Sequence, residues 1–338
     1  MKLIYLFVPV LILGCSTGKE TKRDRFFLQG NESLAHQDFD QAVDFYTKSL
    51  ENDPNFASAY NNRGVARIED GHSYEAIQDY NQAIAINPDY YEAIFNRAYA
   101  YENIGKISNA LEDVSFLEGI FPDSAYIYFY KGLLLTTDRQ YKSGIRQFQK
   151  AINLDTSNMD AYVNLATLYF YQNQVDSSRF WLRYILKRQP NEPNVYNTLS
   201  QIYLAESDYQ NALITINQAL NIVPQEPYFL NNRGQVYLEM KDYEKALKDI
   251  NKSILLDPKN AWAFRNKGIY HLSQKNYNEA IKLMNDALKR NKFIDEIYSY
   301  LGEAFMGKGD MENACNAWKQ GVALNEKRSI NLYQANCR

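Results

Sequence analysis

The chain has 338 residues, of which 46% are hydrophobic, 14% aromatic and 23% charged. Its formal net charge is −3, so no basic field favours nucleic acid as a partner. No apolar run after Cys15 is long enough to cross a membrane.

The N-terminal stretch differs from everything that follows. Lys2 supplies a positive start, Leu3 to Leu13 is apolar, and the stretch closes with the motif ILGC. It is too short to span a bilayer comfortably and has the layout of a secretory signal. Its end resembles a bacterial lipobox, in which Cys15 would become the acylated first residue; an ordinary signal peptide or a short anchor with an incidental cysteine is the alternative. We therefore expect a lipoprotein signal peptide at 1–14 and a lipid-anchored, flexible tether at 15–22.

Small residues then recur every 34 positions, without insertion or deletion. If the frame starts at Arg23, position 8 carries one series from Gly30 to Gly302, and position 20 carries another from Ala42 to Ala314. Large apolar residues fill positions 4 and 24, and position 32 is proline in six repeats. A stack of identical helical hairpins needs a small residue at each crossing, so the spacing predicts nine hairpins. The predicted repeats are 23–56, 57–90, 91–124, 125–158, 159–192, 193–226, 227–260, 261–294 and 295–328.

Within one repeat, apolar residues follow helical spacing rather than strand alternation. The second repeat predicts one helix over about 57–69, a turn around 70–73 and a second helix over about 74–86. Small residues at positions 8 and 20 would let the two helices approach, with large residues beside them. Proline at position 32 would end the second helix.

This pattern resembles the tetratricopeptide repeat, and the resemblance covers residues 23–328. It implies an all-α fold: a right-handed α-solenoid superhelix of nine 34-residue hairpins, with residues 329–338 as a short C-terminal capping helix. The departures are local, because Thr156, Lys292 and Glu326 replace the proline at position 32.

Two of the three cysteines lie near the C-terminus. In an exported protein Cys315 and Cys337 could form a disulfide that pins the cap over the last hairpin. The alternative is two free thiols.

The sequence offers little for catalysis. His36, His72 and His271 are the only histidines, and no cluster has zinc-ligand spacing. Phosphate-binding glycine motifs and a nucleophile elbow are absent from the sequence. We predict no enzyme activity, no cofactor, no metal and no small-molecule substrate.

In the family that the chain resembles, the concave wall is built from positions 2, 5, 6, 9, 12 and 13 of the first helix. Aromatic residues gather at these positions in the third to fifth repeats, which predicts a groove for an extended peptide or a partner helix. The alternative is that curvature buries these rings against the next first helix. The predicted groove residues are Phe95, Tyr99, Tyr126, Phe129, Tyr130, Leu133, Phe170 and Tyr171.

Asparagines recur at positions 5 and 6, and aligned amides could bond a ligand's backbone. The alternative is that they bond neighbouring helices. The ladder comprises Asn61, Asn62, Asn96, Asn164, Asn197, Asn231, Asn232 and Asn266. Cations at position 7 are expected to lay their stems over the hairpin and reach solvent; they are Arg63, Arg97, Lys131, Arg233 and Lys267.

These features together favour a membrane-anchored scaffold that binds a protein or peptide in its concave groove, in a cell-envelope complex. Two alternatives stay open: a periplasmic holdase for extended chains, and a non-catalytic subunit of an envelope enzyme. The lipid membrane would be contacted through acylated Cys15. Ser16 is not the aspartate that retains some lipoproteins at the inner membrane, which favours the outer membrane, on its periplasmic face.

Overall fold

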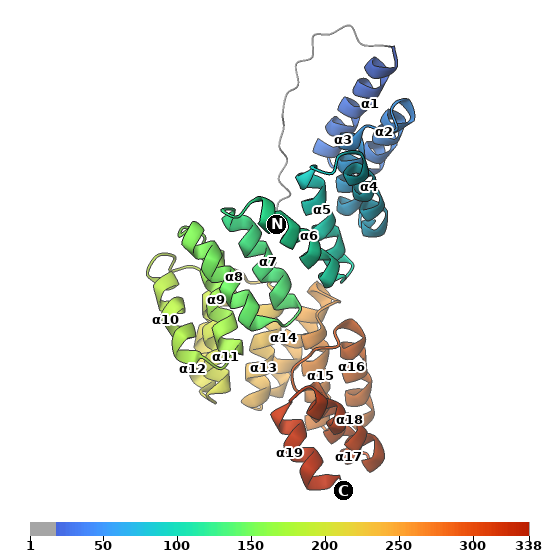
Figure 1. Ribbon diagram of the computed structural model, residues 1–338. Coiled ribbons are helices and arrows are strands. Elements are labelled where there is room, and N and C mark those ends of the chain that lie inside the picture. Colours follow the sequence, from blue (N-terminus) through green and yellow to red (C-terminus); the bar gives the residue numbers. More distant parts are fainter. Residues whose placement is uncertain (1–17, 338) are drawn as a thin grey trace. The chain divides into compact units, whose positions relative to one another are not determined.

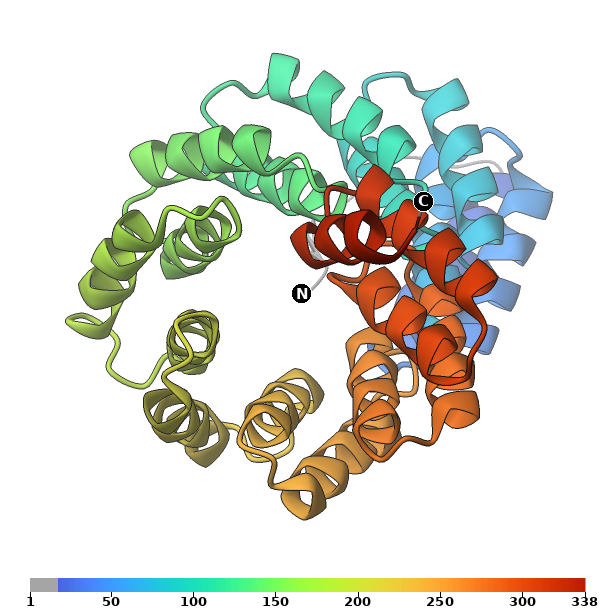
Figure 2. The same ribbon diagram turned by 90° about the horizontal axis from the view of Figure 1, so that it is seen from below.

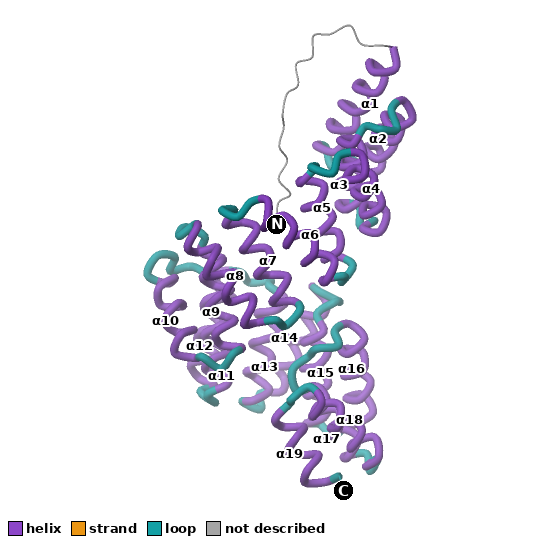
Figure 3. Tube along the Cα trace, viewed as in Figure 1, coloured by secondary structure: helices purple, strands orange, loops and turns teal. Residues whose placement is uncertain are grey.

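The computed structural model describes residues 18–337, with side chains from Thr21 onwards. Every regular element in this range is an α-helix, and short loops join the helices (Figures 1 and 3). The helices are α1 Gly18–Ala35, α2 Phe39–Asn52, α3 Ala57–Glu69, α4 Ser73–Ile86, α5 Tyr91–Asn103, α6 Ile107–Ile120, α7 Ala125–Thr137, α8 Tyr141–Leu154, α9 Met159–Tyr171, α10 Val175–Leu186, α11 Pro193–Ala205, α12 Tyr209–Ile222, α13 Pro227–Glu239, α14 Tyr243–Leu256, α15 Ala261–Ser273, α16 Tyr277–Arg290, α17 Ile297–Gly307, α18 Met311–Ala323 and α19 Lys327–Asn336.

The helices pair in chain order as hairpins, and α19 follows as a cap. The predicted all-α solenoid of about nine repeats plus a capping helix is therefore confirmed. The expected signal peptide and the lipidated Cys15 lie outside the described residues. The tether differs from expectation at its end, because α1 begins at Gly18 and residues 18–22 are helical.

The chain divides into two compact units, Met1–Asn164 and Leu165–Arg338, which we call unit 1 and unit 2. In unit 2 the first helices of successive hairpins contact one another: α11 meets α13, α13 meets α15, and α15 meets α17. The yellow-to-orange helices of this unit form two layers in Figure 2. The first-helix layer therefore presents one continuous face.

The small residue at position 8 is required by the large residue at position 24. A Cβ atom on Gly64 would lie 2.6 Å from Cε1 of Tyr80, and one on Gly132 would lie 2.6 Å from Cε1 of Phe148. Both rings are fully buried. The side chain of the second helix thus occupies the space that a β-carbon would need, as the repeat pattern predicts.

The turn inside each hairpin uses a left-handed residue at position 15. Three of these residues are glycines, such as Gly71 (φ 84°), and the others include Arg139 and Lys275 (φ 58° and 60°). The amide of His72 donates to the carbonyl of Arg67, and the amide of Gly71 to that of Ile68. This is the Schellman arrangement that ends a helix and reverses the chain.

The arginines at position 7 do not simply reach solvent, contrary to prediction. Arg63 pairs with the buried Asp79 of its own repeat at 2.6 Å, and its Nη1 also donates to Thr47 Oγ1 of the preceding repeat at 2.9 Å. Each such arginine therefore joins two successive repeats. The same arrangement recurs for Arg97 with Asp113 and Asn81, and for Arg233 with Asp249 and Asn217.

The last hairpin is closed by α19. Cys315 of α18 and Cys337 form a disulfide with a Cα–Cα distance of 5.7 Å, inside the range that such bonds adopt. Arg328 of α19 donates to both carboxylate oxygens of Glu303 in α17. These contacts hold the capping helix on the open end of the stack.

Candidate functional site

A groove of about 1110 Å³ lies in unit 2. We call it the unit-2 groove. It is lined mainly by first helices, from the end of α9 through α11, α13 and α15 to the start of α17. Most lining residues occupy positions 2, 5, 6, 9, 12 or 13 of their repeats, the positions of the predicted concave wall.

Aromatic side chains form much of the lining. Tyr228 and Trp262, both at position 2, lie with ring centroids 6.5 Å apart in an edge-to-face arrangement. Tyr228 is 46% exposed and Tyr171 is 52% exposed, so large ring surfaces face solvent. Aromatic rings supply large contact area at low entropic cost, which suits a binding surface. The aromatic lining residues are Phe170, Tyr171, Tyr209, Tyr228, Phe229, Trp262 and Tyr300.

Asparagine side chains of α11, α13 and α15 form a chain of hydrogen bonds along this wall. Asn232 Nδ2 donates to Asn197 Oδ1 at 2.7 Å, Asn231 Nδ2 to Asn232 Oδ1 at 3.3 Å, and Asn266 Nδ2 to Asn231 Oδ1 at 2.8 Å. Asn197 and Asn232 are half-buried and line the groove, so each keeps capacity for a further hydrogen bond.

Unit 1 repeats this amide chain. Asn96 donates to Asn61 at 3.0 Å, Asn61 to Asn62 at 3.1 Å, and Asn62 to Asn31 at 2.9 Å. In both units the inner members are buried; they are Asn61, Asn96, Asn231 and Asn266. These four amides hydrogen-bond asparagines of their own and neighbouring helices, in keeping with the alternative given above, and their contact with a ligand's backbone stays a prediction. Asn164 donates to Asp160 O within its own helix.

The aromatic residues predicted in unit 1 pack mostly on one another. Phe95 lies 5.5 Å from Tyr126 and 5.1 Å from Tyr130, centroid to centroid, and Phe129 lies 5.8 Å from Phe148. Tyr130 is only 1% exposed, while Phe95, Tyr99, Tyr126 and Phe129 are half-buried. The curvature alternative therefore holds for Tyr130.

A carboxylate lies within this cluster of unit 1. The hydroxyl of Tyr130 donates to Glu102 Oε2 at 2.7 Å. Burial raises the pKa of the Glu102 carboxyl, partly offset by this bond. Burial also raises the pKa of Tyr130, with the negative charge of Glu102 adding to the effect. The cluster is thus a packed, partly desolvated layer.

Charge in the unit-2 groove is unevenly distributed. The lining contains four carboxylates but only one guanidinium, that of Arg265. Arg265 is buried and donates to Asn266 Oδ1 and to the carbonyl of Asp295, so it ends the amide chain and holds the loop before α17. The carboxylates belong to Glu226, Glu239, Asp295 and Glu296.

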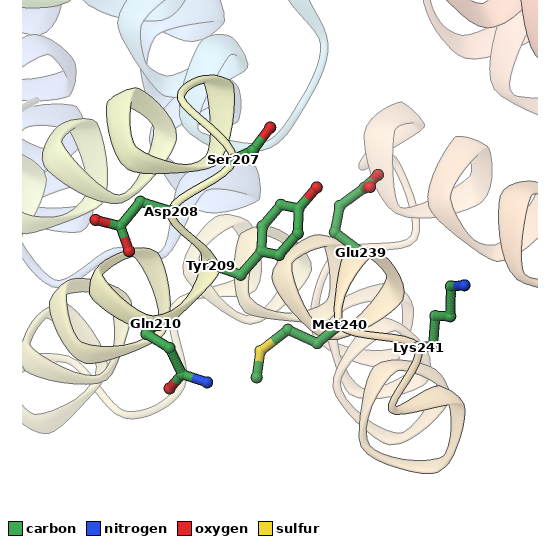
Figure 4. Close-up of a pocket in the computed structure, with 7 residues that line it drawn as sticks. All are labelled: Ser207, Asp208, Tyr209, Gln210, Glu239, Met240 and Lys241. Carbon is green, nitrogen blue, oxygen red and sulfur yellow. The ribbon is translucent and has the colours of Figure 1, made fainter.

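A smaller recess of about 500 Å³ adjoins the groove and shares Ser207, Tyr209 and Glu239 with it. Figure 4 shows Tyr209, at the start of α12, projecting towards Glu239 at the end of α13. Lys241 and Met240 complete the far side of this recess. The groove therefore extends past its first-helix wall at the turn between α13 and α14.

Of the predicted groove residues, five line the unit-2 groove. They are Phe170, Tyr171, Asn197, Asn231 and Asn232. Tyr228, Trp262 and Tyr300 also occupy concave-wall positions (2, 2 and 6). They were missed because aromatic residues were sought only in the third to fifth repeats. Scanning position 2 of the later repeats would have found Tyr228 and Trp262.

Within residues 18–337 no group of His, Cys, Asp or Glu side chains has the arrangement of a metal site. No helix of the same range is long and apolar enough to cross a membrane.

Comparison with known proteins was made at the level of sequence and of fold. Models of the tetratricopeptide repeat match residues 57–112, 193–260 and 265–323, which together are more than half of the chain. WD and tetratricopeptide repeats protein 1 of Homo sapiens is 33% identical over 106 residues, which are 30% of this chain and 16% of that protein. Small glutamine-rich tetratricopeptide repeat-containing protein beta of Homo sapiens is 40% identical over 58 residues, 17% of this chain and 19% of that one. The chain therefore matches less than a fifth of either relative's length.

Three solved structures share the fold. Yeast Tom70 aligns with a TM-score of 0.59 at 17% identity, over 91% of this chain and 68% of that one. Cut9 with Hcn1, an APC/C hetero-tetramer, gives a TM-score of 0.56 at 18% identity, over 86% of this chain and 57% of that one. A tetratricopeptide repeat protein from Parabacteroides merdae gives 0.51 at 16% identity, over 84% and 99%. The register of nine repeats, the small-to-large contact at the six crossings where position 8 is glycine and the matching family models agree, and the chain belongs to the tetratricopeptide repeat family.

Proposed function

We propose that this protein is a membrane-tethered scaffold that holds an extended segment of a partner protein in the unit-2 groove. Members of its family are typically non-catalytic scaffolds for protein–protein interaction, which supports a binding role. The observation that carries the proposal is the groove itself, because about 1110 Å³ lined by exposed rings and half-buried amides suits an extended chain.

The groove offers two kinds of contact to such a segment. Tyr228 and Trp262 present ring surface for apolar side chains. Asn197 and Asn232 present amides that can bond a peptide backbone whatever its sequence. Clustered exposed aromatic rings on a protein surface usually mark a binding site, so this face is a better docking surface than the packed cluster of unit 1.

The proposal is tested by cross-linked capture from membranes with wild type and the double variant Tyr228→Ala/Trp262→Ala. Tyr74→Ala is the matched control, because Tyr74 is 63% exposed on α4 and lies outside the groove. We expect one stoichiometric partner with wild type and the control, and its loss with the double variant. Equal capture by all three proteins would overturn the assignment, and capture of many unrelated chains would indicate a holdase.

The tether is proposed from Cys15 and is tested separately. Metabolic labelling with a radioactive fatty acid should label wild type, and Cys15→Ser should lose both the label and the membrane fraction. If Cys15→Ser stays labelled and membrane-bound, the lipoprotein proposal fails, whereas the groove proposal is unaffected. An outer-membrane, periplasmic location is proposed on the same basis and is tested by membrane fractionation and protease protection.

A further inference from the structure

The charge of the unit-2 groove limits which extended segments it can hold. Among its lining residues four are carboxylates and one is a cation, Arg265. A ligand with acidic side chains would meet like charges along most of the groove, which costs binding free energy. The lining therefore disfavours ligands whose side chains are negatively charged.

Arg265 does not offset this field by offering itself to a ligand. It is 7% exposed, and all three of its guanidinium nitrogens already donate: Nε and Nη2 to Asn266 Oδ1, and Nη1 to the Asp295 carbonyl at 2.8 Å. Its position is structural, since it ends the amide chain. A ligand carboxylate would have to displace these internal bonds.

Three of the four carboxylates form no direct ion pair with a cation of the described residues, although Glu296 acts on the charges of Arg265 and Arg328. Within residues 21–337, Glu226, Glu239 and Glu296 form no ion pair, although Glu226 accepts a hydrogen bond from the amide of Tyr228. Glu239 and Glu296 are exposed to solvent. They are therefore open to an incoming cation.

Rings lie beside these carboxylates. The pKa of Tyr300 is raised by burial, and the charges of Glu296 and Glu239 raise it further, while Arg328 and Arg265 act in the opposite direction. The pKa of Tyr228 is raised by burial and by the charges of Asp257 and Glu226. The guanidinium of Arg328 already lies over the Tyr300 ring, 4.3 Å from its centroid. The half-exposed ring of Tyr228, which experiences the charge of Glu226, is therefore the aromatic face that can receive a ligand ammonium or guanidinium group.

We infer that the unit-2 groove selects an extended segment that carries lysine or arginine side chains, with Glu239 and Glu296 as the residues that contact these cations and the rings of Tyr228 and Trp262 lining the same groove. This inference rests on the proposed function and names the chemistry of its ligand. The neutral amides would bond the backbone of the ligand, and the carboxylates would bind its lysine or arginine side chains.

The test measures fluorescence anisotropy of three labelled peptides against the full chain. The peptides alternate serine with lysine, with glutamine or with glutamate. We expect the lysine peptide to bind most tightly, with an affinity that falls as salt is raised, and the glutamate peptide to bind least.

The decisive variant is Glu239→Gln/Glu296→Gln, in which both exposed carboxylates lose their charge without a change of size. It should weaken the lysine peptide about three- to tenfold and leave the glutamine peptide unchanged. The matched control is Glu244→Gln/Glu312→Gln, which neutralises two exposed carboxylates on α14 and α18 outside the groove. This control should bind the lysine peptide as wild type does.

The outcomes separate the two proposals. If the glutamine or glutamate peptide binds as well as the lysine peptide, and Tyr228→Ala/Trp262→Ala weakens all of them, the groove binds segments but the selection of cations is wrong. If the lysine peptide binds and the control double variant weakens it as much as the groove variant does, the attraction is general and the inference fails. If no peptide binds, the inference fails as well, and partner capture decides the proposed function on its own.

Discussion

The same repeat positions have different uses in the two units of the molecule. In each unit the asparagines at positions 5 and 6 form a chain of hydrogen bonds, with the same donor direction and similar Nδ2–Oδ1 distances. In unit 1 the surrounding rings, such as Phe95 and Tyr130, pack on one another and on Glu102. In unit 2 the rings of Tyr228 and Trp262 line an open groove.

This difference follows from the residues that occupy positions 5 and 6. Phe95 and Tyr130 occupy positions 5 and 6 of neighbouring first helices and pack on each other, with ring centroids 5.1 Å apart, so that Tyr130 is buried and Phe95 is half-buried. Tyr228 and Trp262 occupy position 2, one turn earlier, and positions 5 and 6 of their repeats carry no aromatic ring; they are Asn231, Asn232, Arg265 and Asn266. An aromatic residue on the concave face therefore indicates a binding surface only when its neighbours at positions 5 and 6 leave it uncovered.

The largest expected difference in the free energy of unfolding is between variants that remove one ring from each unit. Tyr130→Ala should lower the free energy of unfolding by about 3–5 kcal/mol, because it removes a fully buried ring and its bond to Glu102. Tyr228→Ala should cost about 1 kcal/mol or less, since its ring is half exposed. Urea unfolding followed by circular dichroism measures both. Equal losses would contradict the distinction between packed and open rings.

The next effect compares two members of one amide chain. Asn266→Ala should cost about 2–3 kcal/mol, because it leaves Nε and Nη2 of Arg265 and Oδ1 of Asn231 without this partner inside a buried site. Asn232→Ala should cost about 1 kcal/mol, since water can reach the vacated groups at the groove surface. Thermal unfolding of the two variants gives the order, and the reverse order would show that the inner amides are not a buried chain.

Glu102 gives unit 1 a pH dependence of its own. Its folded-state pKa is raised above the ordinary 4.5 by burial, so its contribution to stability is full below that value and is lost as pH rises through the folded pKa. Glu102→Gln keeps an acceptor for Tyr130 and removes the charge. The variant should therefore be more stable than wild type at neutral pH, with the gap closing in acid. A gap that widens in acid would reverse the sign of the pKa shift.

The smallest effect concerns the hairpin turns. Lys275→Gly should raise stability by about 1 kcal/mol, because Lys275 has φ 60° at a position where other repeats use glycine. Lys275→Ala keeps the strained backbone and is the matched control, with no gain expected. A gain from both variants would point to the lysine side chain rather than to the backbone.

The sequence predicts the fold almost completely and the site only in part. Position 8 and position 24 define the crossing, and the structure places Gly64 against Tyr80 as that pattern requires. The asparagines could be identified from the sequence, but not which groups they bond. Periodicity places a side chain on a face of a helix and does not say whether the next helix covers it. Asp79, partner of Arg63, was also missed, although aspartate recurs at position 23 wherever position 7 is arginine.

The most direct test of the central claim is photo-cross-linking from defined positions of the full chain. A photoreactive phenylalanine analogue replaces Gln235, which lies at position 9 of α13 and lines the unit-2 groove, and in a second protein it replaces Lys252, an exposed residue of α14 outside the groove. We predict an adduct with the captured partner from position 235 and none from position 252. Adducts from position 252 alone would contradict the account, because the partner would then lie on the second helices and not in the groove.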